Sequence, residues 1–235
     1  MAGCSIVNAF RAACGGVRVA FMILSPGRNY IFVHIPKTGG TALSVALESR
    51  AMKDDILIGD TPKARRRRGR LKGAQAAGRI WKHSSLADID GLVARDFVEG
   101  AFRFALVRNP WDRVVSYYHW LRDQSFDHPA VHLAARVGFA EFVQNDVTQE
   151  ALRGLPYGSY LRGWDGLERS AHFIRLEHFA QDAAPLWAHL GFSLELPHLN
   201  ASRREAGYRH YYTTATAQVV EAICAEDIAR FGYSF

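Results

Sequence analysis

Residues 36–41 read Pro-Lys-Thr-Gly-Gly-Thr and combine the residue types that bind a phosphate group. Gly39 and Gly40 lack a Cβ atom, so the backbone can adopt unusual φ values and let an anion approach its N–H groups. Lys37 adds a mobile positive charge, and the two threonines add hydroxyl donors. The residues expected to hold the phosphate are Lys37, Thr38, Gly39, Gly40, Thr41 and Ala42.

The flanking sequence predicts a strand before this motif and a helix after it. Residues 30–35 read Tyr-Ile-Phe-Val-His-Ile, and residues 42–48 read Ala-Leu-Ser-Val-Ala-Leu-Glu. Thr41 is expected to cap the helix with its hydroxyl. Because the first turn of a helix presents unpaired N–H groups, the strand, turn and helix together predict an anion site.

A second block combines the same kinds of element. The apolar residues 102–107 predict a strand, and Arg108 follows that strand directly. Asn109 and Pro110 are typical of an N-cap and a first helical residue, which places Ser116 about two turns along the helix. A planar guanidinium and a short hydroxyl suit a terminal phosphate, so Arg108 and Ser116 are expected to bind one.

The two blocks resemble those of sulfotransferases that use 3′-phosphoadenosine 5′-phosphosulfate (PAPS). The order Pro-Lys-Thr-Gly-Gly-Thr resembles their 5′-phosphosulfate loop, and an Arg followed by a Ser eight positions later resembles their 3′-phosphate segment. The Arg-Lys-Gly triplet of the cytosolic small-molecule branch is missing, which favours the carbohydrate-type branch (sulfotransferase family 2-like). The resemblance covers most of residues 29–235.

This resemblance implies an α/β protein with a three-layer P-loop-like fold, in which helices flank a central parallel sheet. It implies a single sulfotransferase domain over residues 29–235, after an N-terminal extension over residues 1–28. It also implies PAPS as sulfate donor, its desulfated product PAP, no metal, and a hydroxyl acceptor on a sugar or glycan. Lys37 would stabilise charge on the leaving phosphate, while Ser202 and Arg203 would complete the nucleotide pocket.

An alcohol acceptor must lose a proton as it attacks, which requires a base within hydrogen-bond reach. His83 is the candidate base, because it precedes the second block as the catalytic His does in the glycan-sulfating branch. His34 and His119 compete for this role. A helix is predicted from Ser84 or Ser85 toward Phe97, which would place His83 at a junction.

Later segments add a strand and two helices. Residues 172–176 predict a strand, residues 179–190 a helix ended by Gly191, and residues 216–231 a final helix. The basic stretch over residues 63–72 favours a loop because like charges repel. Alternatively, this stretch is a basic lip that attracts an anionic acceptor, and residues 125–163 are expected to shape the acceptor site.

The composition of the 235 residues suits one α/β domain, with 49% hydrophobic residues and a net charge of +6. That charge suits an anionic nucleotide and leaves nucleic acid or anionic lipid open, but no nucleic-acid-binding signature is present.

Three widely spaced cysteines indicate neither a disulfide scaffold nor a zinc site, which favours a reducing, cytoplasmic location. Arg11 and Arg18 divide the apolar start, so no transmembrane segment is expected.

Two other functions remain open. ATP-dependent kinases also use a strand, a Gly-rich turn and a helix, but their Lys follows the glycines, whereas Lys37 precedes them. A non-catalytic nucleotide- or glycan-binding protein would keep both phosphate sites without turnover. The identity of the acceptor and the oligomeric state depend on features outside these motifs.

Overall fold

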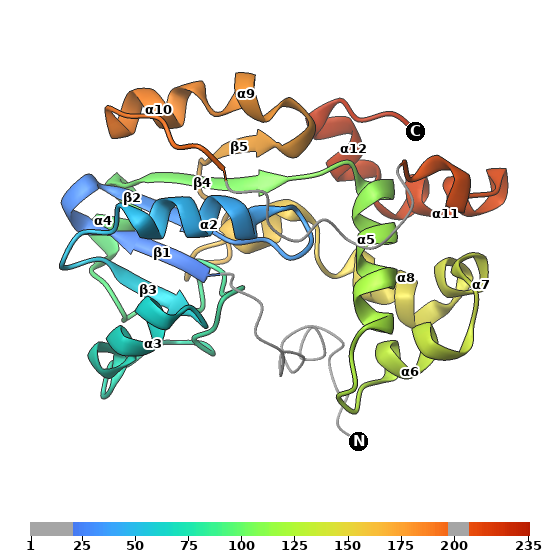
Figure 1. Cartoon of the computed structure of the whole chain (residues 1–235), viewed down its shortest axis with the longest axis horizontal. Coiled ribbons are helices and arrows are strands. Elements are labelled where there is room, and N and C mark those ends of the chain that lie inside the picture. Colours follow the sequence, from blue (N-terminus) through green and yellow to red (C-terminus); the bar gives the residue numbers. More distant parts are fainter. Residues whose placement is uncertain (1–20, 197–206) are drawn as a thin grey trace. The chain divides into compact units, whose positions relative to one another are not determined.

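The computed structural model describes residues 21–196 and 207–235, and its centre is a five-stranded sheet (Figure 1). The strands lie in the order β3-β1-β2-β4-β5, with β2 paired parallel to β4 and β4 parallel to β5. β1 pairs antiparallel with both β2 and β3. The sheet is therefore mostly parallel, with β1 alone reversed. The strands are β1 (Phe21–Ser25), β2 (Tyr30–Val33), β3 (Ile56–Gly59), β4 (Phe102–Val107) and β5 (His172–Arg175).

β1 lies within the segment expected as an N-terminal extension, yet it is part of the sheet. All five of its residues are buried, as are the four residues of β2. Strands buried on both faces read as continuous apolar runs, which explains the sequences Phe-Met-Ile-Leu-Ser and Tyr-Ile-Phe-Val. Ser44 of α2 also donates a hydrogen bond of 3.2 Å to the carbonyl of Phe21.

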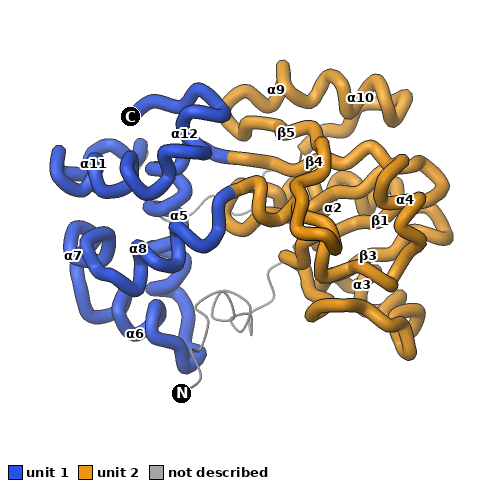
Figure 2. The backbone as a smooth tube through the Cα atoms, turned by 180° about the vertical axis from the view of Figure 1, so that it is seen from behind, with its two compact units in different colours: residues 1–16, 108–156, 200–235 blue, residues 17–107, 157–199 orange. Residues whose placement is uncertain are grey.

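The described chain divides into two compact units (Figure 2). The sheet unit, orange in Figure 2, comprises residues 21–107 and 157–196 of the described chain. The helical unit, blue, comprises residues 108–156 and 207–235. The expected single domain over residues 29–235 stays a prediction.

Helices of the sheet unit flank the sheet. They are α2 (Gly40–Ser49), α3 (Pro62–Arg67), α4 (Arg95–Gly100), α9 (Phe179–Asp182) and α10 (Ala184–Leu190), with short 3-10 turns η1 (Pro26–Arg28), η2 (Arg68–Leu71), η3 (Tyr157–Leu161) and η4 (Leu176–His178). One face of the sheet packs against Leu43 and Leu47 of α2, Ala64 of α3 and Leu186 of α10. Alternation along the strands turns Met22, Leu24 and Ile31 to the other face, where they are also buried.

The helical unit has its own apolar core. Its helices are α5 (Pro110–Arg122), α6 (Pro129–Arg136), α7 (Phe139–Gln144), α8 (Asp146–Arg153), α11 (Thr214–Ile223) and α12 (Ala225–Phe231), with the 3-10 turn η5 (Arg209–Tyr211). Residues of α5, α6, α7 and α11 share one buried cluster. Trp111 connects α5 to α11 and to the residues just before α11. Its indole N–H donates to the carbonyl of Ala217 at 2.9 Å, and its own carbonyl accepts from the hydroxyl of Tyr212 at 2.8 Å.

The predicted helix over residues 84–97 is wrong. Residues 84–94 form turns and an isolated bridge, and only α4 is helical in this region. The N–H of Leu86 donates to the carbonyl of Tyr160 at 3.1 Å, which ties this segment to a distant part of the chain instead of to a helical turn. Gly91 also takes a left-handed φ of 84°, which interrupts a helix.

The predicted loop over residues 63–72 is also wrong, because this stretch folds into α3 and η2. Thr61 caps α3 by accepting a hydrogen bond of 2.8 Å from the N–H of Ala64. Lys63 donates to the carbonyl of Glu48 at 2.6 Å, and Arg67 donates to that of Met52 at 2.8 Å. These cations therefore bind backbone carbonyls near the end of α2, and such contacts offset the repulsion between like charges.

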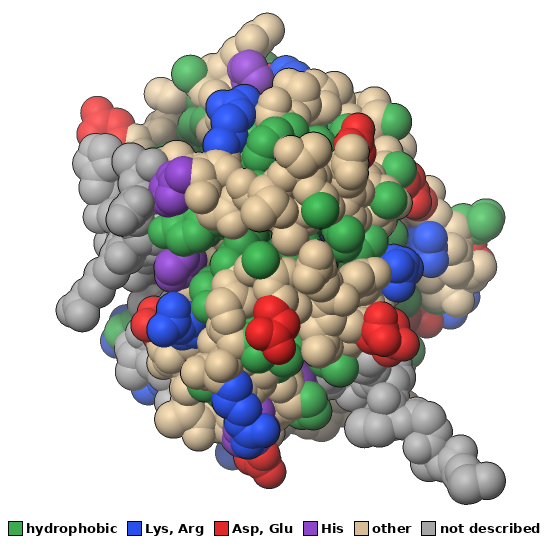
Figure 3. Space-filling model, turned by 90° about the vertical axis from the view of Figure 1, so that its right-hand side faces the viewer, with side chains coloured by type: hydrophobic (Ala, Val, Ile, Leu, Met, Phe, Trp, Pro, Cys, Tyr) green, Lys and Arg blue, Asp and Glu red, His purple; other side chains and the backbone are tan. Residues whose placement is uncertain are grey.

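The surface in Figure 3 mixes charges of both signs. On this face, lysine and arginine side chains lie scattered between acidic ones and do not gather into one patch.

Within residues 21–196 and 207–235, none of the helices combines the length and the apolar character needed to cross a bilayer.

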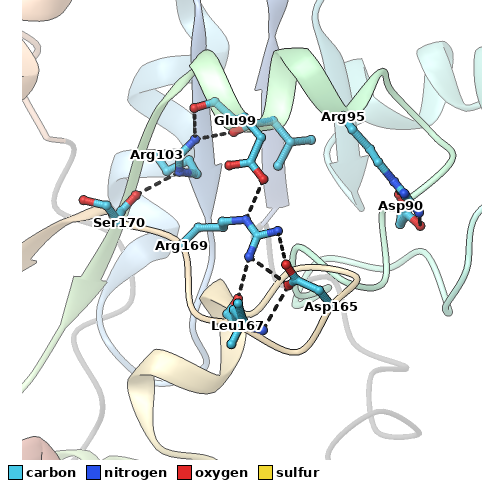
Figure 4. A network of polar contacts seen from close by, with 9 residues as sticks. Asp90, Arg95, Glu99, Arg103, Asp165, Leu167, Arg169 and Ser170 are labelled. Carbon is cyan, nitrogen blue, oxygen red and sulfur yellow. Dashed lines mark hydrogen bonds and ion pairs between the residues drawn. The ribbon is translucent and has the colours of Figure 1, made fainter.

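An arginine-centred network ties α4 to the loop before β5 (Figure 4). Arg169 donates to Glu99 of α4 at 2.7 Å and to both carboxylate oxygens of Asp165, at 2.8 and 2.9 Å. The guanidinium groups of Arg95 and Arg169 lie 4.5 and 4.6 Å from the ring centre of Trp164. Arg103 of β4 also donates to the carbonyl of Ser170 at 2.8 Å, which holds the start of β5 beside β4.

Candidate active site

The Pro-Lys-Thr-Gly-Gly-Thr motif forms the turn between β2 and α2, as the sequence predicts. Lys37 has a φ of 67° and Gly39 a φ of 84°, so two residues of this short turn are left-handed. A left-handed conformation at a residue with a Cβ atom costs about 1–2 kcal/mol. The structure therefore holds Lys37 in a strained conformation, and such strain is concentrated at functional sites.

Both glycines of the motif are required by their surroundings. A Cβ atom on Gly39 would lie 2.9 Å from two carbon atoms of Leu176, in addition to the positive φ. A Cβ atom on Gly40 would lie 2.3 Å from Cδ2 of His34. At Gly40 the backbone lies too close to the His34 ring for another residue, whereas at Gly39 the positive φ is the stronger constraint because the end of the Leu176 side chain can shift.

The prediction that Thr41 caps the helix is wrong. Gly39 occupies the N-cap position, α2 begins at Gly40, and no side chain of the cap residue binds the first turn. An N-cap without a side-chain acceptor leaves the N–H groups of the first turn for another partner, such as an anion. Thr41 and Ala42 lie half-buried in this turn.

Thr38 has an internal role in the turn. Its side chain is fully buried, and its hydroxyl donates to the carbonyl of Ile35 at 2.9 Å. This bond braces the turn, so the hydroxyl proton that was expected to contact a phosphate is already used. Contacts of Thr38 with a phosphate through its backbone stay a prediction.

His83 lies beside this turn and is held in one orientation. Its Nδ1 lies 2.8 Å from the carbonyl oxygen of His34. Because a carbonyl oxygen only accepts, Nδ1 must carry the proton, which leaves the lone pair on Nε2. The rings of His34 and Trp81 flank the imidazole at centroid distances of 4.6 and 5.0 Å, the first tilted by 30° and the second nearly perpendicular at 83°.

The surroundings keep both imidazoles neutral. Burial lowers the pKa of His83 well below its ordinary value, and the positive charges of neighbouring Lys82 and Lys37 act in the same direction. Burial and the same two lysines lower the pKa of His34 to about 3. Lys82 is itself buried, with its ammonium 3.9 Å from a carboxylate oxygen of Asp60. An imidazole that is neutral near pH 7 has the protonation state that a general base requires.

The two competing histidines have different surroundings. His34 is 4% exposed, and its Nδ1 is buried without a hydrogen-bond partner. His119 belongs to α5 of the helical unit, where its ring contacts Tyr118 and Tyr211. Of the three, His83 combines a defined tautomer with a position next to the turn between β2 and α2, and it stays the candidate base.

The second block has the local structure that the sequence predicts. Asn109 caps α5 by accepting hydrogen bonds from the N–H groups of Trp111 and Asp112, at 3.1 and 3.4 Å. Nε of Arg108 donates to Asp112 at 2.7 Å, and the guanidinium forms an ion pair with the same carboxylate. Ser116, 8% exposed, lies one turn beyond Asp112 on the same face of α5.

Sequence reasoning missed three residues of these two sites. Asp112 orients the guanidinium of Arg108. Its spacing of four positions from both Arg108 and Ser116 indicates in the sequence that the three residues share one helix face. Trp81 and Lys82 precede His83 directly, but only the fold shows that they lie against it. Ser202 and Arg203, predicted to complete the nucleotide pocket, lie outside the described residues.

Comparison with known proteins identifies the fold. The structure is similar to the crystal structure of mouse sulfotransferase SULT7A1 complexed with PAP, with a TM-score of 0.50 and 17% sequence identity. The match covers 87% of this chain and 85% of that chain. The chain therefore has the P-loop-like α/β fold of a sulfotransferase. No protein-family model matches the sequence. No curated protein matches it either.

Proposed function

We propose that this protein transfers a sulfuryl group from PAPS to a hydroxyl group on a sugar or glycan. The observation that carries the proposal is the arrangement in the sheet unit, where a strained glycine turn and an uncapped helix start lie beside a neutral, oriented imidazole. The fold likeness to a sulfotransferase complexed with PAP supports the same conclusion.

The turn between β2 and α2 fits the 5′ end of such a donor. Its glycines give an anion access to the backbone, and the positive end of the α2 dipole lies at Gly40. PAPS supplies an already activated sulfuryl group. The role of Lys37 is to stabilise the negative charge that develops on the departing phosphate, together with the N–H groups of the turn.

His83 is proposed to take the proton from the acceptor hydroxyl at Nε2. The bond from Nδ1 to the carbonyl of His34 fixes the ring, so Nε2 keeps one direction during the reaction. The charges of Lys37 and Lys82 lower the pKa of His83 in the ligand-free protein. A bound anion offsets these charges, so donor binding raises that pKa toward the working range and strengthens the base.

Arg108 and Ser116 are proposed to bind the 3′-phosphate of the nucleotide. Asp112 holds the guanidinium by two of its nitrogens, which orients it on the face of α5 that also carries Ser116. A preoriented guanidinium loses less entropy when it binds a phosphate.

The acceptor is proposed to be an anionic glycan. Arg65 and Arg66 of α3 are exposed, and Asp60 lies 3.6 Å from Arg68 and 3.9 Å from Lys82. Asp60 thus pairs with Arg68 of the basic segment and with Lys82, the residue that precedes His83. Carboxylated or sulfated glycans should therefore be better acceptors than neutral glycans of the same length, and a double R65E/R66E variant should reduce that preference.

The test is to incubate the protein with isotopically labelled PAPS and a panel of glycans, lipids and phenols, and to follow the label by mass spectrometry. A labelled glycan is the expected result. Binding of PAP without any labelled product would favour a non-catalytic binding protein. Transfer from ATP that requires Mg²⁺ would instead favour a kinase.

Two variants and two matched controls make this test specific. Lys37→Ala and His83→Ala should each lower the transfer rate by about 100-fold or more. Lys53 and His210 are exposed side chains of the same types outside residues 63–72 and 125–163, so Lys53→Ala and His210→Ala should keep the parent rate. A loss of rate in the controls equal to that in the site variants would contradict the assignment.

A further inference from the structure

His34 lies between the phosphate-binding turn and the base. Its ring packs so closely against Gly40 that a Cβ atom there would lie 2.3 Å from Cδ2 and 2.8 Å from Nε2. On another side, its ring centre lies 4.6 Å from that of His83, with 30° between the two planes. The carbonyl of His34 also accepts the Nδ1–H of His83. One residue therefore contacts the first residue of α2 and the base.

A histidine at this buried position lowers the stability of the fold. Its side chain is 4% exposed, and Nδ1 has no hydrogen-bond partner. A buried polar atom without a partner costs free energy that an apolar side chain of similar size would avoid. The preceding residues of β2 are all apolar and buried, so packing alone does not call for an imidazole here.

We propose that His34 is the positioning residue of the site, whose ring, wedged between Gly40 and the ring of His83, fixes the base relative to the phosphate-binding turn. Its ring provides a flat surface for His83, and its carbonyl sets the tautomer. The same ring touches the start of α2, so the position of His83 is fixed relative to Gly40. This inference rests on the proposed function, in which His83 is the base.

The test compares two substitutions of His34 with matched substitutions of another strand histidine. His34→Ala removes the ring and keeps the carbonyl, whereas His34→Phe keeps a ring of similar shape. His172 is half-buried in β5 and contacts Asp182, outside the turn and the base, so His172→Ala and His172→Phe serve as controls. The readouts are kcat and KM for PAPS and the affinity for PAP by calorimetry.

His34→Ala should lower kcat by about 10–100-fold, as loss of a supporting residue commonly does, and leave the PAP affinity within about three-fold of the parent. His34→Phe should restore kcat to within about five-fold of the parent, and both His172 variants should match the parent. A His34→Ala kcat within about three-fold of the parent would overturn the proposal. So would a fall in kcat that only follows the loss of PAP binding, because that indicates a structural role.

A second readout works even if the parent transfers no sulfuryl group. In protein with ¹⁵N-labelled histidine, the His83 side chain should show one tautomer with the proton on Nδ1, in the parent and in His34→Phe. His34→Ala keeps the carbonyl and therefore the tautomer, but the His83 signals should broaden because the ring has lost its flat support and moves. An unchanged His83 spectrum in His34→Ala would overturn the positioning role, whereas missing transfer by the parent would overturn only the proposed function.

Discussion

At the scale of single residues, the site depends on atoms held in costly states. Lys37 has a left-handed backbone, and His34 has a buried nitrogen without a partner. Each state costs stability, and each lies within the same turn region. Such a concentration of cost is typical of a functional site, because the surrounding core must stabilise what the local sequence disfavours.

The buried imidazole of His34 makes stability depend on pH. Its pKa is about 3 in the folded protein against 6.5 for an ordinary histidine, so between these values the unfolded chain binds a proton that the folded chain does not. Stability should therefore fall by about 1.4 kcal/mol per pH unit below about pH 6.5 on account of this residue. Above about pH 6.5, the contribution of His34 to the free energy of unfolding should not change with pH.

Urea unfolding of the parent and of His34→Phe checks this linkage. Between about pH 7.5 and pH 5, the parent should lose about 2 kcal/mol more than the variant. Parallel losses in the two proteins would show that His34 is not held neutral by the fold.

Arg108 is expected to distinguish PAP from nucleotides without a 3′-phosphate. Arg108→Lys keeps the charge but loses the planar fork, so the affinity for PAP should fall by about ten-fold or more. AMP, which lacks the 3′-phosphate, should bind the parent and the variant equally. Arg122→Lys, at the exposed far end of α5, is the matched control. Calorimetry with both nucleotides measures the difference, and an equal loss for PAP and AMP would place Arg108 elsewhere.

At the scale of elements, the turn between β2 and α2 is the part on which the site depends most. Gly39 and Gly73 have nearly the same φ, 84° and 78°, but a Cβ atom on Gly39 would meet Leu176 whereas one on Gly73 would meet nothing within 4 Å. Gly73→Ala should therefore cost about 1 kcal/mol from the backbone alone. Gly39→Ala should cost more and also weaken PAP binding.

Urea unfolding and PAP titration of these two variants separate backbone strain from crowding. If Gly39→Ala and Gly73→Ala lost equal stability and both bound PAP like the parent, the close approach at Gly39 would have no role in the site.

Local signals predicted the elements that carry these two motifs. The strand before Lys37, the strand before Arg108 and the helix capped by Asn109 lie where the sequence places them. The strand predicted over residues 172–176 and the helix predicted over residues 179–190 are also confirmed. That helix is broken at Ala183, which separates α9 from α10. In each case the apolar pattern and the capping residue favour the same structure, so the local preference and the fold agree.

Elements set by distant contacts were not predicted. The turns over residues 84–94 depend on backbone bonds to residues 160–162, and α3 depends on carbonyls supplied by residues 48–55. β1 has no motif and falls in the segment that the sequence suggests is an extension, although it is buried in the sheet. The surroundings of His83 were missed for the same reason, because His34 lies 49 positions earlier in the chain.

At the scale of the whole molecule, positive charge is the property most relevant to an anionic donor. The chain has a net charge of +6, and two of its cations, Lys37 and the buried Lys82, act on His83. Attraction between a charged protein and a charged ligand is screened by salt, with a Debye length of about 10 Å at 0.1 M.

PAP affinity should therefore fall as salt is raised, by about ten-fold between about 50 and 500 mM NaCl. Lys37→Ala should show a shallower dependence, because one of the charges that face the nucleotide is gone. Titrations over this range check the prediction, and a slope independent of salt would argue against binding through phosphate groups.

Calorimetric titration of the full chain with PAP is the most decisive experiment on nucleotide binding. Saturable binding of one PAP per chain is expected, weakened about ten-fold or more by Lys37→Ala and unchanged by Lys72→Ala. No heat of binding at any accessible PAP concentration, or equal affinity in the parent and Lys37→Ala, would contradict it.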